Sequence, residues 1–413
     1  MIYTLFGDGI HDDTLAIQEL IDNSKGGLSL PQPTKCYLIS KPLELPSNFS
    51  LTLPRFAEIK LAPNSNCLML KNRLTDELES HGVDIVYKYL KGEKPEYFAE
   101  NIEITGGIWN FNNKEQSPNP MVTKIKIPDY AGYGMLFIGI KGFRLSSLTL
   151  KDPVTFAVTL DTVSYFTVDN IVFDFNMGNP QPWNMDGIHI NGNCHFGHIH
   201  NLKGRCHDDL VALNADEGSF GPISNITVDG LYAEDCHSCV RLLAADTKVS
   251  NIHITNIYGT YHQYCIGITR YKKAIDRGSF DCITLDNIYA SKAERFSYYK
   301  RDGLEEYPVI YIQDGLHIKH LKISNFHRRE YTTLLPSIIV SGLGAVSYEE
   351  QDEIIEFGKE KVIKPTIIDC LMLDNISVEN HINDQEIPFL VNEGIINELY
   401  ATCIYNNGKK IEL

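Results

Sequence analysis

The 413-residue sequence contains no run of 18 apolar residues, which excludes an ordinary transmembrane helix. It opens with MIYTLFGDG, a segment that lacks the basic and apolar regions of a signal peptide. We therefore expect a cytoplasmic protein, or a secreted or periplasmic one whose signal peptide has been removed.

Basic residues are scarce: 37 Lys and Arg stand against 53 Asp and Glu, a formal net charge of −16. This balance argues against nucleic acid or an anionic membrane as the main partner. Only 22% of the residues are charged while 43% are hydrophobic, so a large buried core is expected and disorder of the whole chain is not. We predict one domain over residues 1–413, and the sequence leaves its oligomeric state open.

The ten cysteines form no paired pattern, since only Cys236 and Cys239 have CxxC spacing. A zinc site of the usual kind needs a second such pair or a His-x₃₋₅-His segment. We interpret the two cysteines as buried free thiols that pack as small hydrophobes. No metal and no cofactor is predicted.

What the chain does have is a recurring cassette, apolar-x-(Asn/Gly/Ser)-apolar. Its corner residues are Gly106, Ser147, Asn170, Asn201, Gly230, Asn256, Asn287, Asn325 and Asn375. From Ser147 to Asn287 they are 23, 31, 29, 26 and 31 residues apart, the length of one solenoid turn. Alternating apolar positions with Asn or Gly at the corner indicate short strands joined by left-handed turns. The predicted fold is all-β, a right-handed parallel β-helix.

A solenoid needs a cover at its end, because an open coil exposes apolar core and unpaired strand edges. Residues 12–23 read as an amphipathic helix whose apolar side chains are Leu15, Ile17, Leu20 and Ile21. This helix is expected to cap the N-terminus within residues 1–30. Three stretches break the repeat, at about 71–100, 112–133 and 327–364, and are predicted to be loop insertions beside a cleft.

Tyr232, Tyr258 and Tyr289 occupy the same place in successive cassettes. We expect them to form an aromatic ladder with a structural role. Stacking against a sugar is the alternative.

The segment 184–214 places three carboxylates, Asp186, Asp208 and Asp209, about one repeat apart. Residues one coil apart stack at ~4.8 Å, and a diagonal across two coils supplies the larger separation that glycosidic hydrolysis requires. Asp208 and His237 each follow a corner residue by seven positions. If residues 178–184 are counted as an insertion, Asp186 falls at the equivalent position on its own coil. The three are predicted to lie along one stripe.

These motifs resemble those of the family 28 glycoside hydrolases, which include polygalacturonases and belong to the pectin lyase-like superfamily. NMDGI (184–188) is similar to their Asn-Thr-Asp-Gly-Ile, HDDLVAL (207–213) to Gly-Asp-Asp-Cys-Ile-Ala, and CHSC (236–239) to Gly-His-Gly. The resemblance spans roughly residues 152–272. It implies an inverting glycoside hydrolase with Asp208 as general acid, Asp186 and Asp209 as the pair that activates water, and His237 tuning the acid; Asn184 would contact the substrate.

The sequence departs from the family at Met185, His207, Cys236 and Ser238. An ungapped comparison also puts residues 267–269 where the family carries the Arg-Ile-Lys that clamps a uronate carboxylate. A three-residue shift would supply Arg270 and Lys272 instead, and Arg241 is the other candidate. The predicted substrates are pectin-type or other oligosaccharides that contain uronates or deoxysugars.

Two other functions fit the same residues. A polysaccharide lyase would use the carboxylates to hold Ca²⁺, and a glycan-binding β-helix would have solvated acids without catalysis. Among hydrolases, exo action is predicted, because the insertions 112–133 and 327–364 flank the active coils and are long for a compact solenoid.

Overall fold

The computed structural model describes residues 4–80, 96–125, 127–128, 130–270, 277–294, 307–342 and 365–413. The chain divides into two compact units: unit 1 comprises Met1–Val211 with Glu217–Phe220, and unit 2 comprises Ala212–Asp216 with Gly221–Leu413. Among the described residues, no helix is both long and apolar enough to cross a membrane.

In unit 1, strands are the main regular structure. Its strands are β1 (Gly27–Ser29), β2 (Tyr37–Ile39), β3 (Leu43–Leu45), β4 (Phe49–Thr52), β5 (Glu58–Leu61), β6 (Leu70–Asn72), β7 (Ala99–Thr105), β8 (Ile108–Asn110), β9 (Met135–Ser146), β10 (Thr149–Lys151), β11 (Val158–Asp174), β12 (Ile188–Ile190), β13 (His195–Arg205) and the start of β14 (Asp209–Asn214). Its helices are α1 (Thr14–Asn23), α2 (Asp76–Ser80), the 3₁₀ helix η2 (Asn113–Glu115) and α4 (Pro120–Thr123).

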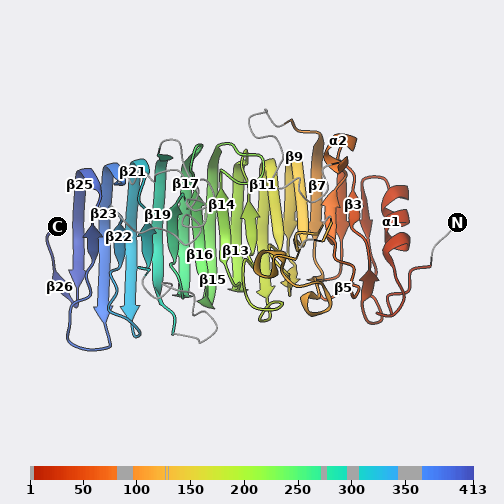
Figure 1. The fold of residues 1–413 in the computed structure, drawn as a ribbon, viewed down its shortest axis with the longest axis horizontal. Coiled ribbons are helices and arrows are strands. Elements are labelled where there is room, and N and C mark those ends of the chain that lie inside the picture. Colours follow the sequence, from red (N-terminus) through yellow and green to blue (C-terminus); the bar gives the residue numbers. More distant parts are fainter. Residues whose placement is uncertain are drawn as a thin grey trace. The chain divides into compact units, whose positions relative to one another are not determined.

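The strands of unit 1 pair in parallel from coil to coil (Figure 1). β11 pairs with β9 on one side and with β13 on the other, so that Val168 lies between Leu145 and Ile199 in register. All three side chains are buried. Apolar residues of the same kind therefore stack in columns inside the coils, which is the core that the alternating pattern predicted.

Unit 2 repeats this architecture. Its strands are the end of β14, β15 (Ile223–Cys236), β16 (Ser238–Leu243), β17 (Lys248–Tyr261), β18 (Ile266–Thr269), β19 (Gly278–Lys292), β20 (Ile310–Ile312), β21 (Leu316–Glu330), β22 (Ile338–Val340), β23 (Ile367–Asn380), β24 (Leu390–Asn392), β25 (Ile395–Asn406) and β26 (Lys409–Lys410). β15, β17, β19, β21, β23 and β25 pair in parallel in that order, and β26 pairs antiparallel with β25.

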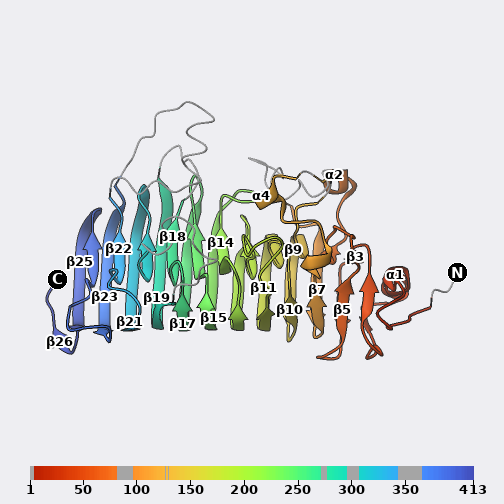
Figure 2. The same cartoon turned by 60° about the horizontal axis from the view of Figure 1, so that its bottom comes forward.

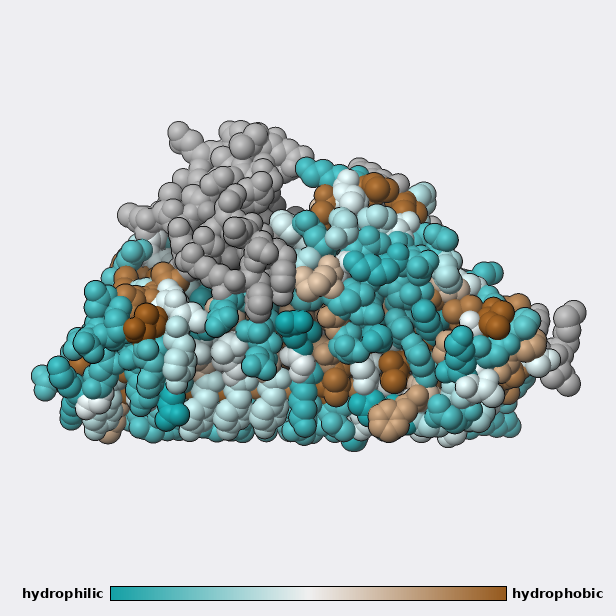
Figure 3. All heavy atoms as spheres, turned by 90° about the horizontal axis from the view of Figure 1, so that it is seen from below, coloured by the Kyte–Doolittle hydropathy of each residue, from teal (hydrophilic) through white to brown (hydrophobic). Residues whose placement is uncertain are grey.

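The corner residues confirm the repeat that the sequence indicated. All nine have a positive φ, from 50° at Asn325 to 83° at Gly106. Asparagine and glycine adopt this left-handed backbone at low cost. The right-handed parallel β-helix is confirmed, and on the face that Figure 3 shows, polar side chains predominate outside it.

The N-terminal helix is shorter than predicted, and its buried face is different. α1 covers the end of the coils beside β1 and β3 (Figure 1), with Ile17 and Ile21 inside. Of the four apolar side chains named from the sequence, Leu15 and Leu20 are 52% and 39% exposed and lie outside the buried face. Positions four apart share a helix face, whereas Leu15 lies about 200° around the axis from Ile17.

The three predicted insertions have different outcomes. The segment 71–100 includes the end of β6, α2 and the start of β7, and 112–133 includes η2 and α4. The stretch 327–364 was wrong as a continuous loop, because β21 extends to Glu330 and β22 follows. Apolar residues at alternate positions there continue the repeat. Residues 81–95 and 343–364 lie outside the described residues.

The tyrosine ladder is present in unit 2. Tyr232 and Tyr258 stack with ring centroids 5.3 Å apart, Tyr258 and Tyr289 do the same at 5.3 Å, and His327 continues the stack at 4.9 Å. Each inner ring has both faces covered by its neighbours, so it offers only an edge to solvent. Because a sugar stacks on a ring face, this arrangement supports the structural role.

Candidate active site

The segment that leads to Asp186 is held between neighbouring coils of unit 1. The Ala157 amide donates to the Asp186 carbonyl at 3.0 Å, and the Gly187 amide donates to the Asp209 carbonyl at 2.9 Å. The His207 amide donates to the Met185 carbonyl at 3.1 Å. These bonds fix the backbone of the first aspartate against that of the Asp-Asp pair on the next coil.

Gly187 makes this close approach possible. A Cβ at this position would lie 2.6 Å from the Leu210 carbonyl oxygen and 2.8 Å from the Phe173 ring. Both neighbours belong to packed strands that cannot withdraw cheaply. The glycine of NMDGI is therefore required by packing beside the carboxylates.

The three predicted carboxylates come together. Asp186, Asp208 and Asp209 each place an oxygen so that all three lie within 4.8 Å of one another, and their exposures are 3%, 5% and 0%. Such a group can hold water, donate a proton or ligate a divalent cation.

Two residues that the sequence reasoning missed complete this group. His189 Nδ1 lies 2.7 Å from Asp186 Oδ2, and His189 Nε2 lies 2.8 Å from Glu217 Oε2. Burial alone lowers the pKa of His189, but the two carboxylates outweigh it and raise the pKa to about 10. His189 is therefore an imidazolium at neutral pH, held between two acids.

A buried hydrogen-bond network positions Glu217. The Asp161 carboxylate accepts from the Ser219 amide at 3.0 Å and from the Thr162 hydroxyl at 2.9 Å. The Glu217 carbonyl accepts from the Gly192 amide at 3.1 Å. Gly218, between Glu217 and Ser219, has φ +60°, and a Cβ there would lie 2.0 Å from Asp161 Oδ2. The turn is thus shaped to bring Glu217 to His189.

The imidazole ring of His189 is also held from its face. It stacks on Phe156 with ring centroids 4.0 Å apart and planes 9° apart. Phe156 belongs to a hydrophobic cluster, which we call the wall cluster, made of Leu68, Leu78, Tyr133, Leu136, Ile138 and Phe156. Leu78 is in α2 and Tyr133 ends the 112–133 insertion, so this cluster joins both excursions to the histidine.

The 112–133 insertion is tied to the loop that precedes Asp186. Asn119 donates from Nδ2 to the Trp183 carbonyl at 2.7 Å and from its amide to the Asn179 carbonyl at 2.8 Å. Lys114 bonds to the Gly178 carbonyl. Figure 2 shows α2 and α4 on the same side of the unit 1 coils. One insertion therefore reaches residues 178–184, where half-buried Asn184 has a left-handed backbone with φ 52°.

The pKa of His207, which is next to Asp208, is shifted in the opposite direction to that of His189. His207 is equally buried, with 2% of its surface exposed, but burial and the Arg205 charge lower its pKa to about 4. His207 is therefore neutral at physiological pH and adds no charge beside the carboxylates.

The remaining predicted site residues belong to unit 2. His237 is buried, and its carbonyl accepts from the Gln263 amide at 2.8 Å. Arg241 is half-buried, and its Nε donates to the Tyr264 hydroxyl at 3.1 Å. Cys236 and Cys239 are buried free thiols, as predicted.

Arg270 is a poor candidate for a substrate clamp. Its side chain is only 8% exposed, and its Nη2 lies 3.1 Å from Asp314 Oδ2. Its Nε donates to the Asp314 carbonyl at 3.0 Å. The guanidinium is therefore committed to a buried ion pair, and Lys272 lies outside the described residues.

Comparison with known proteins finds solved structures that share this fold. The sequence matches no protein-family model and no curated protein. An endo-xylogalacturonan hydrolase from Aspergillus tubingensis superposes with a TM-score of 0.56 at 14% identity, covering 96% of this chain and 92% of that one. This chain shares its fold with that hydrolase.

Two other solved structures have a comparable degree of similarity. The family 28 exopolygalacturonase of Yersinia enterocolitica gives a TM-score of 0.52 at 12% identity, covering 99% of this chain and 78% of that one. The surface adhesin PfbA of Streptococcus pneumoniae gives 0.57 at 13% identity, covering 98% and 91%. Since enzymes and an adhesin share the fold, the function has to be argued from the site.

Proposed function

We propose that this protein is a glycoside hydrolase that cleaves an O-glycosidic bond with the carboxylates Asp186, Asp208 and Asp209. The observation that carries the proposal is the placement of their three oxygens within 4.8 Å of one another, beside an imidazolium bonded to one of them. Its support from comparison is the fold that this chain shares with an endo-xylogalacturonan hydrolase and an exopolygalacturonase.

The three acids have different roles in this proposal. Asp208 donates a proton to the leaving oxygen, while Asp186 and Asp209 hold the attacking water and take its proton. Like charges this close oppose the simultaneous ionisation of all three carboxyl groups, which is the condition under which one member of such a group can serve as a general acid.

His189 acts on one of the three carboxylates, Asp186. Its positive charge lies 2.7 Å from Asp186 and therefore favours the ionised form of that carboxylate. Glu217 and Phe156 hold the ring in place. We assign His189 as a positioning residue that favours Asp186 as the base.

The stereochemical outcome is inversion in this proposal. Two carboxylates hold the water while the third protonates the leaving group, so no acid has to attack the sugar. A retaining enzyme would use a carboxylate as nucleophile, at a separation of about 5–5.5 Å. Because the oxygens here lie within 4.8 Å, distance alone does not separate the two. Proton NMR of the first product does: the inverted anomer is expected, and the retained anomer would contradict the assignment.

We further propose exo action on uronate- or deoxysugar-containing oligosaccharides, such as fragments of pectin. The support is the 112–133 insertion, which bonds to residues 178–184 on the approach to Asp186. A wall there leaves room for a chain end rather than for a continuous polymer. Arg241 is the candidate for a uronate carboxylate, and His237 for tuning the acid; their variants Arg241→Gln and His237→Gln test these roles.

The experiment is a panel of pectic and other plant or microbial oligosaccharides followed over time. Steady release of a monomer or one small unit, with new reducing ends and no ultraviolet-absorbing product, is expected. Early fragments of mixed length would contradict exo action, while an absorbing double bond formed only with calcium would identify a lyase. Binding without new reducing ends would identify a glycan-binding β-helix instead.

A further inference from the structure

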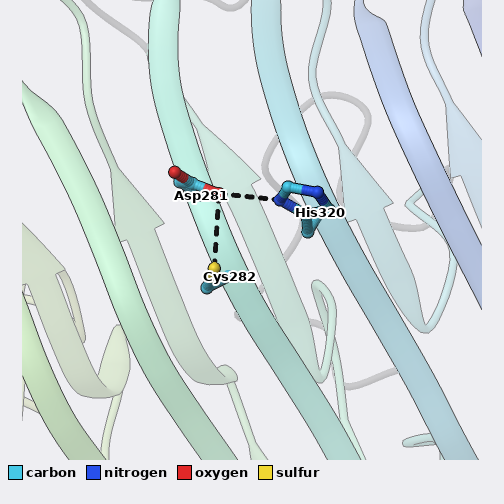
Figure 4. Close-up of side chains that lie close together, drawn as sticks. All are labelled: Asp281, Cys282 and His320. Carbon is cyan, nitrogen blue, oxygen red and sulfur yellow. Dashed lines mark hydrogen bonds and ion pairs between the residues drawn. The ribbon is translucent and has the colours of Figure 1, made fainter.

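A second group of ligand-forming side chains lies on the surface of unit 2. Asp281 and Cys282 are on β19, and His320 is on the neighbouring strand β21. Figure 4 shows the three side chains converging from the two strands. The Asp281 Oδ1 atom lies 3.0 Å from His320 Nδ1 and 3.4 Å from Cys282 Sγ. One ligand atom from each residue falls within 4.8 Å of the other two.

The backbone explains why these residues meet. Phe280 pairs with Ile318 and Ile283 pairs with Leu321, so Cys282 and His320 occupy corresponding positions on consecutive coils. Cys282 has a left-handed backbone with φ 53°, as Asn251 has, with φ 55°, at the corresponding place one coil earlier. A cysteine with this backbone takes a position where the neighbouring coil uses asparagine. The thiol is therefore presented at the surface of the coil.

We propose that Asp281, Cys282 and His320 form a three-ligand site for a divalent zinc ion. Carboxylate oxygen, imidazole nitrogen and thiolate sulfur are the usual zinc ligands, at about 2.0–2.3 Å. In a tetrahedron with these bond lengths, ligand atoms lie roughly 3.3–3.7 Å apart. The 3.0 Å between Asp281 Oδ1 and His320 Nδ1 and the 3.4 Å between Asp281 Oδ1 and Cys282 Sγ lie within a few tenths of an ångström of these values. The ligand atoms of Cys282 and His320 lie within 4.8 Å of each other.

The surroundings fit an open site that water completes. His320 is 62% exposed and Cys282 is exposed, so an ion can enter directly from solvent. Lys248 Nζ lies 3.2 Å from Asp281 Oδ2, which directs that oxygen away and leaves Oδ1 facing the sulfur and the imidazole. A bound ion would link β19 to β21, and hence one coil to the next.

Binding has a proton balance that can be measured. The Cys282 thiol must lose its proton to form the sulfur–zinc bond, whereas a carboxylate is ordinarily ionised at neutral pH. Each zinc ion bound should therefore release about one proton at neutral pH. A site made only of carboxylates would release almost none.

The experiment titrates the reduced protein with Zn²⁺ in two buffers of different ionisation enthalpy, and with Co²⁺ under ultraviolet and visible absorption. We expect one ion per chain, about one proton released, and a thiolate-to-cobalt charge-transfer band. Cys282→Ser should abolish the band and weaken binding at least tenfold, and His320→Ala should weaken it similarly. Binding without the band, or equal affinity in Cys282→Ser, would overturn the proposal.

Cys403→Ser is the matched control. Cys403 is also exposed and left-handed, with φ 55°, so the substitution removes an equivalent thiol and should leave the titration unchanged. Asp208→Asn should also retain the cobalt band, which separates this site from the buried carboxylates. Loss of the band in either variant would contradict the assignment.

Discussion

Both units carry a group of carboxylate and imidazole side chains, but the two groups differ in burial. In unit 1, Asp186 and His189 are almost completely buried and bonded at 2.7 Å. In unit 2, Asp281 and His320 make a similar contact at 3.0 Å, but the histidine is mostly exposed. Water can solvate the second pair, whereas the first must balance its charges within the protein.

This difference explains why the two groups suit different chemistry. In the buried group, a fixed positive charge biases the position of a proton, because the low local dielectric strengthens the interaction. In the exposed group, solvent weakens such a bias. A bound metal ion would hold these side chains in place, as packing holds the buried side chains in unit 1. Residue type alone does not distinguish the two.

The largest effect should come from removing the proposed acid. Asp208→Asn keeps the volume of the side chain but cannot donate a carboxyl proton, so turnover should fall by about 10²–10⁴. Asp174→Asn is the matched control, because Asp174 is an exposed acid on β11 bonded to Lys151. Initial rates and thermal melting of both variants check the prediction. Near wild-type turnover in Asp208→Asn would remove this group from the reaction.

A smaller effect is expected at His189. His189→Gln removes the charge beside Asp186, so turnover should fall roughly 10- to 100-fold, as for outer residues that orient reacting groups. The acidic limb of the pH–rate profile should move to higher pH, because Asp186 loses its positive neighbour. Glu217→Gln should move it in the opposite sense and by less, because His189 stays charged at acidic pH while Asp186 loses a nearby negative charge. A lower melting temperature with an unmoved profile would indicate a purely structural role.

The smallest effects concern stability and pH, where His189 and His207 should act in opposite directions. The pKa of His189 is raised to about 10, so its contribution is complete below pH ~6.5 and is lost as the pH rises through 10. The pKa of His207 is lowered to about 4, so the unfolded state binds a proton first and stability falls as the pH drops from ~6.5 to 4.

Unfolding free energies measured across this pH range test both histidines. His189→Gln should flatten the alkaline decline, and His207→Gln should flatten the acid decline. If the unfolding free energies of the two variants depend on pH in the same way, the environments of His189 and His207 do not differ as described.

The sequence predicted what depends on local pattern. Corner residues such as Asn170 and Asn287 were found because a left-handed turn restricts the residue type directly. Asp186 and Asp208 were brought together correctly because the coil length sets which residues stack. The buried face of α1 was less predictable, since Leu15 and Leu20 are apolar but exposed.

The other features of the site depend on contacts between distant segments, which no short sequence pattern contains. Glu217 lies 28 residues after His189, in an irregular turn shaped by Asp161 and Ser219. The one available signal was a histidine three residues after Asp186, in NMDGIHI. Arg270 had the right chemistry for a clamp, but its burial against Asp314 followed from packing that the sequence does not display.

The asparagine corners have a consequence for mechanical strength. In unit 2, Asn287 bonds to Asn256, which donates to Asp229 at 2.7 Å, and Asn375 donates to Asn325 at 2.7 Å. Each coil is thus fastened chiefly to its immediate neighbours, so tension applied at an end should detach one coil before the next is loaded. The coil between Asn256 and Asn287 contains 31 residues and would release roughly 100 Å of extended chain. Force–extension traces of unit 2 should therefore show a sawtooth whose steps differ in length with the number of residues in each coil.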